Sequence, residues 1–233
     1  MMEMFRELEY SSISVESLLG RPLNDVETRH TPKILYIKGV IEIPLPRPRV
    51  SIIGSRKASQ DGLEAAKTIT KTLVGNQTVI VSGLAEGIDT SAHQTAIDIG
   101  GKTIAVLGTP LNKVYPRKNF ELQQEIMNNH LAVSQFPVGH PTKPKDFVLR
   151  NRTMALISDA TIIVEAGDTS GSLHQGWETL RLGRPLFIWK SVLNNKQLSW
   201  PEKMRQYGAM ELSEPMDIFE VLPSHLEMLD VFQ

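Results

Sequence analysis

The chain has 233 residues, of which 41% are hydrophobic and 22% are charged, and its formal net charge is −1. This composition is typical of a folded globular protein. It excludes a disordered chain and a uniformly basic coat for nucleic acid, although it allows a local basic cleft. The absence of cysteine excludes disulfide bonds, thiolate zinc sites and a cysteine nucleophile.

The first part of the chain combines a short leader, residues 1–33, with one predicted strand. The leader starts with a mixed, acidic segment that lacks the pattern of a signal peptide, and we expect it to hold one helix. No apolar run in the sequence approaches the roughly 20 residues of a membrane helix, so we expect a cytoplasmic protein that does not enter the membrane. Residues 34–39 predict an edge strand, and the proline-rich residues 44–48 predict an extended connector.

Beyond Arg49, short apolar runs alternate with helix-like segments. The runs predict buried strands at 50–53, 78–81, 103–107, 131–133, 160–164 and 185–188. The segments between them predict helices at 59–73, 87–99, 119–127, 147–157 and 171–182. This alternation predicts an α/β domain over residues 34–190, of the extended Rossmann-like, doubly wound type, with a mostly parallel sheet and helices on both faces.

Residues 191–233 form an acidic C-terminal extension in this interpretation. From Glu211 to the end the sequence holds six acidic residues and neither lysine nor arginine. The simpler interpretation is the solvated acidic face of a terminal helix, and the alternative is a segment that packs against a partner or another copy of the chain. We expect the extension to pack on the domain or on a partner.

Small or polar residues follow four of the predicted strands, in the turns Gly54-Ser55-Arg56, Ser82-Gly83, Gly108-Thr109 and Glu165-Ala166-Gly167. The carboxyl ends of parallel strands meet at one edge of a sheet, and glycine there lets a phosphate approach the backbone closely. A guanidinium at Arg56 is suited to bind two phosphate oxygens or to lie against a base. The simpler interpretation is that tight turns favour glycine whatever they bind.

The segment 143–152 places four cations beside an aromatic ring and an amide: Lys143, Lys145, Phe147, Arg150, Asn151 and Arg152. Cations neutralise phosphates and an aromatic face stacks on a base, so the segment predicts contacts with single-stranded nucleic acid. The alternative is that the two arginines pair with carboxylates such as Glu165 or Asp89, and that Phe147 is a core residue.

Two further groups of polar residues have both a structural and a functional interpretation. Ser170-Gly171-Ser172 opens a predicted helix, which indicates either an anion cradle or a helix N-cap. Asp89 and His93 stand four residues apart on another predicted helix, and we interpret them as a structural hydrogen bond that pins the helix to the sheet edge. Because the sequence has no Walker motif, nucleophile elbow or His-x-x-x-His pair, we predict no metal, no cofactor and no catalytic residue.

Taken in order, these blocks resemble the DNA-processing protein A (DprA, or Smf) family over residues 31–188. The resemblance rests on 50–56, 82–89 with Ala92-His93, 104–108, Tyr115-Pro116, Phe147 with 150–152, 164–166 and 170–173. The sequence departs from the family pattern at Gln135, where glutamate is usual, at His174-Gln175, where Thr-Ala is usual, and at Trp189-Lys190, where Pro-Gly is usual.

The resemblance implies a non-catalytic protein that binds single-stranded DNA, forms a homodimer and loads the RecA recombinase during natural transformation. It implies a DNA pocket lined by Arg56, Ser82, Gly83, Lys145, Phe147, Arg150, Arg152, Ser170 and Gly171. The interpretation of the turns and of the basic segment adds Gly54, Ser55, Lys143, Asn151 and Ser172.

Two other functions are compatible with the same turns and cations. Nucleotide phosphoribohydrolases of the LOG type carry a glutamate where this chain has Gln175, and a glutamine cannot act as a general base. Glu178, one helical turn further on, is the residue that such an enzyme would have to recruit. The second alternative is a nucleotide-sensing module that binds a small phosphorylated signal.

Overall fold

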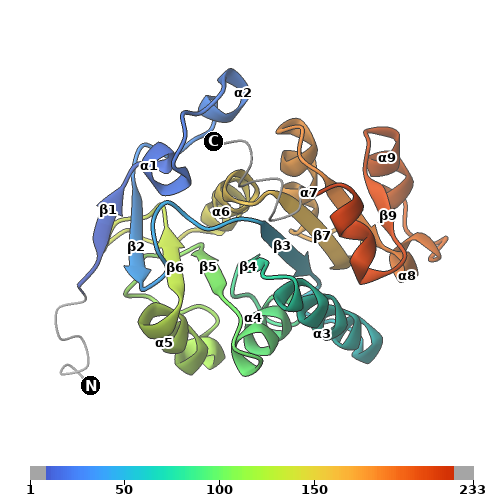
Figure 1. The fold of residues 1–233 in the computed structure, drawn as a ribbon, viewed down its shortest axis with the longest axis horizontal. Coiled ribbons are helices and arrows are strands. Elements are labelled where there is room, and N and C mark those ends of the chain that lie inside the picture. Colours follow the sequence, from blue (N-terminus) through green and yellow to red (C-terminus); the bar gives the residue numbers. More distant parts are fainter. Residues whose placement is uncertain (1–8, 223–233) are drawn as a thin grey trace.

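A single nine-stranded sheet runs through the computed structural model of the protein, which describes residues 9–222 (Figure 1). In spatial order the strands are β1-β2-β6-β5-β4-β3-β7-β8-β9. Their bounds are β1 (Ser11–Ile13), β2 (Leu35–Gly39), β3 (Arg49–Gly54), β4 (Val79–Ser82), β5 (Thr103–Leu107), β6 (Leu131–Ser134), β7 (Ala160–Glu165), β8 (Leu186–Trp189) and β9 (Met210–Leu212).

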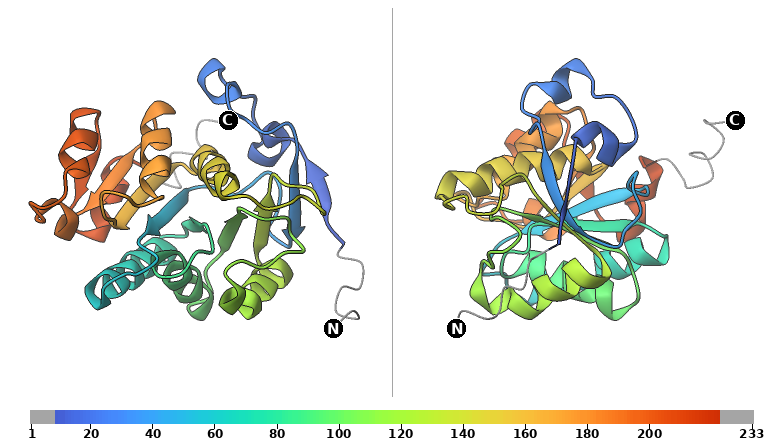
Figure 2. Two further views of the ribbon diagram at one scale, coloured as in Figure 1. Left: turned by 180° about the vertical axis from the view of Figure 1, so that it is seen from behind. Right: turned by 90° about the vertical axis from the view of Figure 1, so that its left-hand side faces the viewer.

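The sheet is parallel from β6 to β9, and its two remaining pairs, β1 with β2 and β2 with β6, are antiparallel. The α-helices are α1 (Val15–Leu19), α2 (Asp25–Thr28), α3 (Gln60–Gly75), α4 (Ile88–Asp98), α5 (Phe120–Asn129), α6 (Pro144–Ile157), α7 (Leu173–Arg181), α8 (Lys190–Leu193) and α9 (Trp200–Gln206). Helices α3, α4 and α5 cover one face, and α6 and α7 cover the other, as Figures 1 and 2 show. The predicted doubly wound α/β fold is confirmed.

The strands sort their side chains between two hydrophobic layers because successive residues of a strand point to opposite faces. In β3, Val50 and Ile52 pack under α3 and α4, whereas Ile53 packs in the layer on the other side of the sheet. This two-sided burial explains why the central strands appear in the sequence as uninterrupted apolar runs rather than as alternating patterns.

The direction of winding reverses between β3 and β7. From β3 the chain runs through β4, β5 and β6 with α3, α4 and α5 as connections, and α6 then returns it to β7 on the other side of β3. Beyond the carboxyl ends of β3 and β7 the connecting segments therefore leave toward opposite faces of the sheet. Such a reversal opens a crevice at the sheet edge, where ligands bind in open α/β sheets.

Both segments that flank residues 34–190 join the sheet. The predicted edge strand, β2, is not at the edge, because β1 from the leader pairs with its outer side. The leader holds two short helices, α1 and α2, rather than one. On the other side, β9 extends the sheet and a 3-10 helix at Pro215–Glu220 packs against α3. Strands of three residues are too short to show a period in the sequence. Residues 223–233 of the acidic extension lie outside the described residues.

Helix α6 begins one turn earlier than the sequence pattern predicts. Pro144 occupies its first turn, and Asp146 accepts a hydrogen bond of 2.7 Å from the Lys143 main-chain N–H. Proline at the first helical position and an acid in the first turn both favour a helix start here.

Within residues 9–222, no helix combines the length and the apolar character needed to cross a bilayer.

A buried arginine joins the proline-rich connector to the start of β7. Arg49 is 3% exposed and donates hydrogen bonds to the carbonyls of Leu45 (2.8 Å) and Ile157 (2.7 Å), and its guanidinium lies 3.3 Å from Asp159. Burial lowers the pKa of Arg49 to about 10. Arg47 lies on the exposed side of the same carboxylate, at 2.9 Å.

This pair of arginines gives a matched test of burial. We expect Arg49→Met to lower the free energy of unfolding by about 3–5 kcal/mol, because it removes one partner of a buried ion pair and leaves carbonyls without donors. Arg47→Met, at the exposed side of Asp159, is expected to cost no more than about 1 kcal/mol. Urea unfolding of both variants measures the two losses of unfolding free energy. Equal losses would contradict the conclusion that burial makes the Arg49 contacts more stabilising than those of Arg47.

Asp89 and His93 do not bond to one another, contrary to the prediction from their spacing. Asp89 accepts hydrogen bonds from the main-chain N–H groups of Gly83 (3.1 Å) and Ala85 (3.4 Å). The Nδ1 atom of His93 lies 2.7 Å from the hydroxyl oxygen of Thr103 in β5. Each residue thus ties α4 to the sheet separately, because Asp89 contacts the turn after β4 and His93, one helical turn further on, contacts the start of β5.

The buried His93 predicts a specific loss of stability in mild acid. Burial lowers its pKa to about 3, below the value of about 6.5 for an unfolded chain. The unfolded state therefore binds a proton as the pH falls below 6.5, whereas the folded state does not, so the stabilisation present above pH 6.5 is lost on acidification. The difference in unfolding free energy between wild type and His93→Gln should shrink by about 2 kcal/mol between pH 7 and pH 5. Urea titrations at both pH values test this, and a constant difference would show that His93 titrates normally.

Candidate nucleic-acid interface

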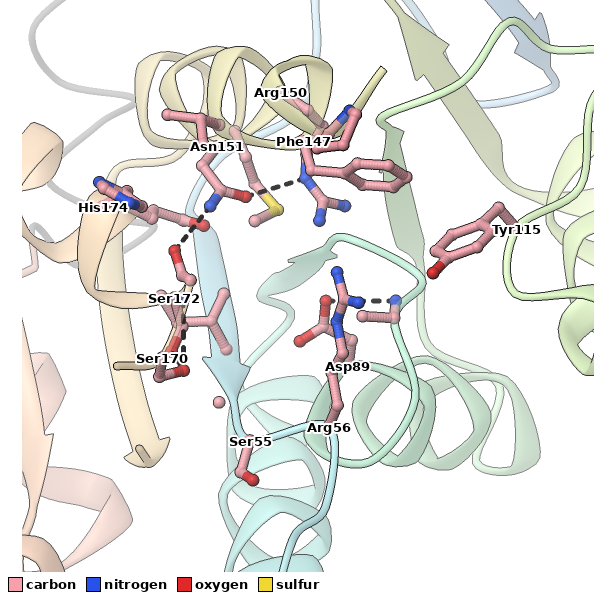
Figure 3. A pocket seen from close by; sticks show the side chains of 18 of the residues that line it. Ser55, Arg56, Asp89, Tyr115, Phe147, Arg150, Asn151, Ser170, Ser172 and His174 are labelled. Carbon is pink, nitrogen blue, oxygen red and sulfur yellow. Dashed lines mark hydrogen bonds between the residues drawn. The ribbon is translucent and has the colours of Figure 1, made fainter. Parts of the chain in front are cut away.

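A cavity of about 870 Å³ lies at the reversal point between β3 and β7 (Figure 3). Its volume is at the upper end of the range of about 300–1,000 Å³ found for ligand sites. Its walls come from the turn after β3, the loop after β7, the loop after β5 and the first turns of α6. These are the segments that a doubly wound sheet brings together beyond the carboxyl ends of its strands.

The cavity is strongly positive although the chain as a whole is not. Its wall contains one carboxylate, Asp89, against five cationic side chains: Arg56, Lys57, Lys113, Lys143 and Arg150. The guanidinium groups of Arg56 and Arg150 point into the cavity from opposite walls (Figure 3). A negatively charged group between them would meet cations on two sides, and the surrounding low-dielectric walls strengthen that attraction.

Arg150 is buried in the wall rather than exposed on it. Only 5% of the residue is exposed, and its Nη1 atom donates hydrogen bonds to the carbonyls of Gly83 and, at 2.9 Å, Val106. Burial, opposed by the nearby carboxylate of Asp89, lowers the pKa of Arg150 to about 10. The proposed ion pair with Glu165 is wrong, because Glu165 instead accepts hydrogen bonds from the start of α3.

Asp89 provides the only negative charge in the cavity wall as the described residues define it. Burial raises the pKa of this carboxyl, while the positive charge of Arg150 and the N–H groups of Ala85 and Gly83 oppose that rise. The carboxylate accepts hydrogen bonds from these two main-chain N–H groups after β4, and it thereby fixes the turn from which α4 starts.

Two aromatic rings stand at one end of the cavity. The rings of Tyr115 and Phe147 are 5.1 Å apart at an angle of 54°, and the guanidinium carbon of Arg56 lies 5.8 Å from the Phe147 centroid. Phe147 is half-buried and lines the cavity, so its interpretation as a core residue is wrong. Gly108 makes room for it, because a Cβ atom there would lie 2.5 Å from the ring.

The two serines before α7 do not cap that helix. Ser172 occupies the N-cap position but makes no side-chain cap hydrogen bond, so the N-cap interpretation is wrong. Instead, the hydroxyl oxygens of Ser170 and Ser172 lie 2.6 Å apart, both in the cavity wall. The first N–H groups of α7 already donate to carbonyls of the preceding turn. A bound anion would therefore meet hydroxyl groups here rather than free main-chain donors.

The structure brings most of the predicted site residues together. The cavity wall contains Gly54, Ser55, Arg56, Lys143, Phe147, Arg150, Asn151, Ser170, Gly171 and Ser172. Gly83 borders a smaller neighbouring pocket that shares Arg56, Phe147 and Arg150 with the cavity.

Besides Gly83, three predicted residues lie outside the cavity wall as far as residues 9–222 define it: Ser82, Lys145 and Arg152. The Ser82 side chain is fully buried and donates to the Ile52 carbonyl at 2.6 Å, so it supports the β3–β4 contact. Lys145 and Arg152 lie on another face of α6, because helical periodicity puts Phe147, Asn151 and Met154 on the cavity side.

Several residues of the site were not predicted from the sequence. Lys57, Lys113, Tyr115, Thr142 and His174 line the cavity but were not among the predicted contacts. Lys113 and Tyr115 belong to the loop after β5, and the rule that residues following a parallel strand converge at the sheet edge would have found them.

The two residues considered for a phosphoribohydrolase reaction, Gln175 and Glu178, are both buried. Glu178 is 8% exposed and forms an ion pair of 2.5 Å with Arg181, outside the cavity wall that residues 9–222 form. Gln175, at the position of the enzyme's glutamate, is buried in that wall. Among the described residues, no group of three or more histidine, aspartate or glutamate side chains is placed to hold a metal ion.

Comparison with known proteins relates nearly all of the described residues to one family. The family model described as DNA recombination-mediator protein A matches residues 14–223. The DNA processing protein DprA of Streptococcus pneumoniae is 42% identical over 163 residues, which are 69% of this chain and 56% of that protein. DprA of Bacillus subtilis is 33% identical over 192 residues, covering 82% of this chain and 65% of its own length. The chain thus spans less than two thirds of the length of these relatives.

Solved structures agree with this comparison. The crystal structure of S. pneumoniae DprA superposes with a TM-score of 0.79 at 33% identity, covering 93% of this chain and 76% of that one. DNA processing protein A of Helicobacter pylori, described for its unique single-stranded DNA binding mode, gives 0.77 at 27% identity and covers 92% and 95%. A molybdenum cofactor binding protein of Rippkaea orientalis shares only the fold, with 17% identity and a TM-score of 0.56. The chain belongs to the DNA recombination-mediator protein A family, whose members include the DprA and Smf proteins.

Proposed function

We propose that the cavity between β3 and β7 binds single-stranded DNA, as part of a DNA-processing protein that acts in DNA uptake and recombination. The observation that carries this proposal is the combination of five cations, one carboxylate and two aromatic rings around one cavity. Phosphates would lie among Arg56, Lys57, Lys113 and Lys143, and the hydroxyls of Ser170 and Ser172 would donate to them. The H. pylori relative, described for single-stranded DNA binding, supports the same ligand.

The aromatic pair favours a single strand over a duplex. Tyr115 is 48% exposed, and its ring lies beside that of Phe147 at the cavity wall. A base can stack on such a ring only when its face is not already covered by neighbouring base pairs. Stacking on aromatic side chains contributes about 1–3 kcal/mol per base and tolerates any sequence. We therefore infer little base preference from this pair.

Two cations outside the cavity extend the proposed interface. Lys145 and Arg152 are seven residues apart on one side of α6, about 10 Å along the helix axis. Lys143, at the start of α6, lines the cavity two residues before Lys145. We propose that a strand leaving the cavity past Lys143 continues over this side of α6, so that only longer oligonucleotides contact Lys145 and Arg152.

The proposal includes binding without cleavage. Gln175 stands where a phosphoribohydrolase would need its glutamate, and Glu178 is engaged by Arg181. Membership in a family of recombination mediators supports the further parts of the proposal, namely a homodimer that works in the cytoplasm and loads a RecA-type recombinase on the bound strand.

Salt dependence tests whether cations of the cavity contact phosphates. We expect fluorescence anisotropy to show tighter binding of oligo-dT than of a duplex of equal length, with log affinity falling linearly as log salt rises. Arg56→Ala should weaken binding and reduce the steepness by about 0.7, the value for one phosphate of a single strand. Arg205→Ala, in the exposed part of α9, is the matched control and should leave the steepness unchanged. An unchanged steepness in Arg56→Ala would remove Arg56 from the proposed interface.

Oligonucleotide length tests the proposed path over α6. We expect the double variant Lys145→Ala, Arg152→Ala to bind a short oligo-dT of about four nucleotides, close to the smallest single-strand site sizes, as tightly as wild type does. With an oligo-dT several times longer, the steepness should fall by about 1.4, which corresponds to two phosphates. Equal effects on both lengths, or an effect on neither, would place the strand elsewhere.

A further inference from the structure

We propose that Arg150 and Asn151 are positioning residues that clamp three walls of the cavity at a fixed separation. This inference rests on the proposed function of the same cavity. It assigns to two adjacent residues of α6 a role different from the phosphate contacts expected of the other cations.

The clamp is a continuous series of hydrogen bonds across the cavity. Arg150 donates from Nη1 to the carbonyls of Gly83, beyond β4, and Val106, in β5. Its Nε atom donates to the Asn151 Oδ1 atom at 2.9 Å, and Asn151 Nδ2 donates to the Gly171 carbonyl at 3.0 Å. Figure 3 shows the link from Arg150 through Asn151 toward the loop that contains Ser172. Two consecutive side chains of α6 therefore join β4 and β5 to the loop before α7.

Burial separates these two residues from the cations of the rim. Arg150 is 5% exposed and Asn151 is 7% exposed, whereas Arg56, Lys57, Lys113 and Lys143 are exposed. The Nε and Nη1 atoms of Arg150 and the amide of Asn151 are bonded within the protein, so the direction of both side chains is fixed before a ligand binds. The close contact at Gly83, where a Cβ atom would overlap the guanidinium, shows that the end of β4 is shaped around Arg150.

The loop that the clamp holds has few other anchors to this side of the cavity. Gly167, Thr169 and Gly171 are exposed, and the hydroxyls of Ser170 and Ser172 bond to each other. The amide of Asn151 fixes the Gly171 carbonyl and thereby the distance between these hydroxyls and the phosphate-facing Arg56. Holding groups in the bound geometry before the ligand arrives lowers the cost of ordering them on binding.

Lysine at position 150 separates geometry from charge. Arg150→Lys keeps the positive charge but offers one nitrogen, which cannot reach both carbonyls and the Asn151 amide at once. We expect it to weaken oligo-dT binding by at least about tenfold, since hydrogen bonds from a charged donor are lost, while the salt steepness stays at its wild-type value. Affinity within a factor of two of wild type would overturn the clamp and make Arg150 a point charge for phosphate.

Asn151→Ala is the second, uncharged variant, and Asn129→Ala on the exposed end of α5 is its matched control. Hydrogen exchange of the DNA-free protein should show faster exchange at the amides of residues 170–172 in Asn151→Ala, with α3 and β3 unchanged, and no change in the control. Stoichiometric titration gives the active fraction, so that weaker binding by folded protein is distinguished from partial unfolding. Unchanged exchange in the loop would overturn the clamp even if binding weakens, because Asn151 would then contact the DNA directly. If wild type does not bind oligo-dT, the proposed function is wrong, and the exchange result still decides whether the clamp exists.

Discussion

The reversal of strand order between β3 and β7 is the constraint on which the rest of the site depends. Because α3 leaves β3 toward one face and the segment after β7 leads to α7 on the other, neither helix fills the space beyond these two strands. Residues that are far apart in the sequence, such as Arg56, Phe147 and Ser170, therefore line the same cavity. The strand order thus decides where a ligand can bind, and the residue types at this edge decide which ligand fits.

The sheet edge also explains why buried polar groups collect around the cavity. Where strands end, their last carbonyl and N–H groups have no partner in a neighbouring strand, and each buried group needs another hydrogen-bond partner. Asp89 supplies acceptors to the turn after β4, and Arg150 supplies donors to carbonyls of β5 and of the same turn. The two buried charges therefore satisfy main-chain groups at the strand ends, and the excess of positive charge in the wall comes from the exposed cations around them.

The fold was predictable because its strands are buried on both faces. Apolar runs such as 50–53 and 103–107 separate cleanly from helical periods, and glycine or serine marks most strand ends, so the doubly wound order followed. The strands at the two margins could not be found in this way, since β1 and β9 have three residues each and are defined by pairing with β2 and β8. Their formation depends on contacts between distant parts of the chain, which local patterns do not show.

The site was predictable in outline, but the direction of each side chain was not. The prediction that the basic segment 143–152 lies near the turns is correct. However, successive residues of a helix point in different directions, so the cations of the segment lie on different faces of α6. Lys145 and Arg152 therefore face away from the cavity while Arg150 between them points into it. Similarly, a spacing of four predicted an Asp89–His93 pair, but Asp89 bonds to the turn after β4 and His93 to the Thr103 hydroxyl at the start of β5.

The division between buried and exposed cations explains how a chain of net charge −1 can still present a site for a polyanion. The exposed cations at the rim retain side-chain freedom and can follow a phosphodiester chain of any sequence, because electrostatic attraction does not require a fixed geometry. Arg150, fixed by carbonyls and by Asn151, contributes shape instead. A wall of this kind need not carry much charge, since its task is to keep Ser170, Ser172 and Phe147 at their places around the ligand. Local concentration of a few cations on a rigid frame thus replaces the general basicity that the composition of the chain excludes.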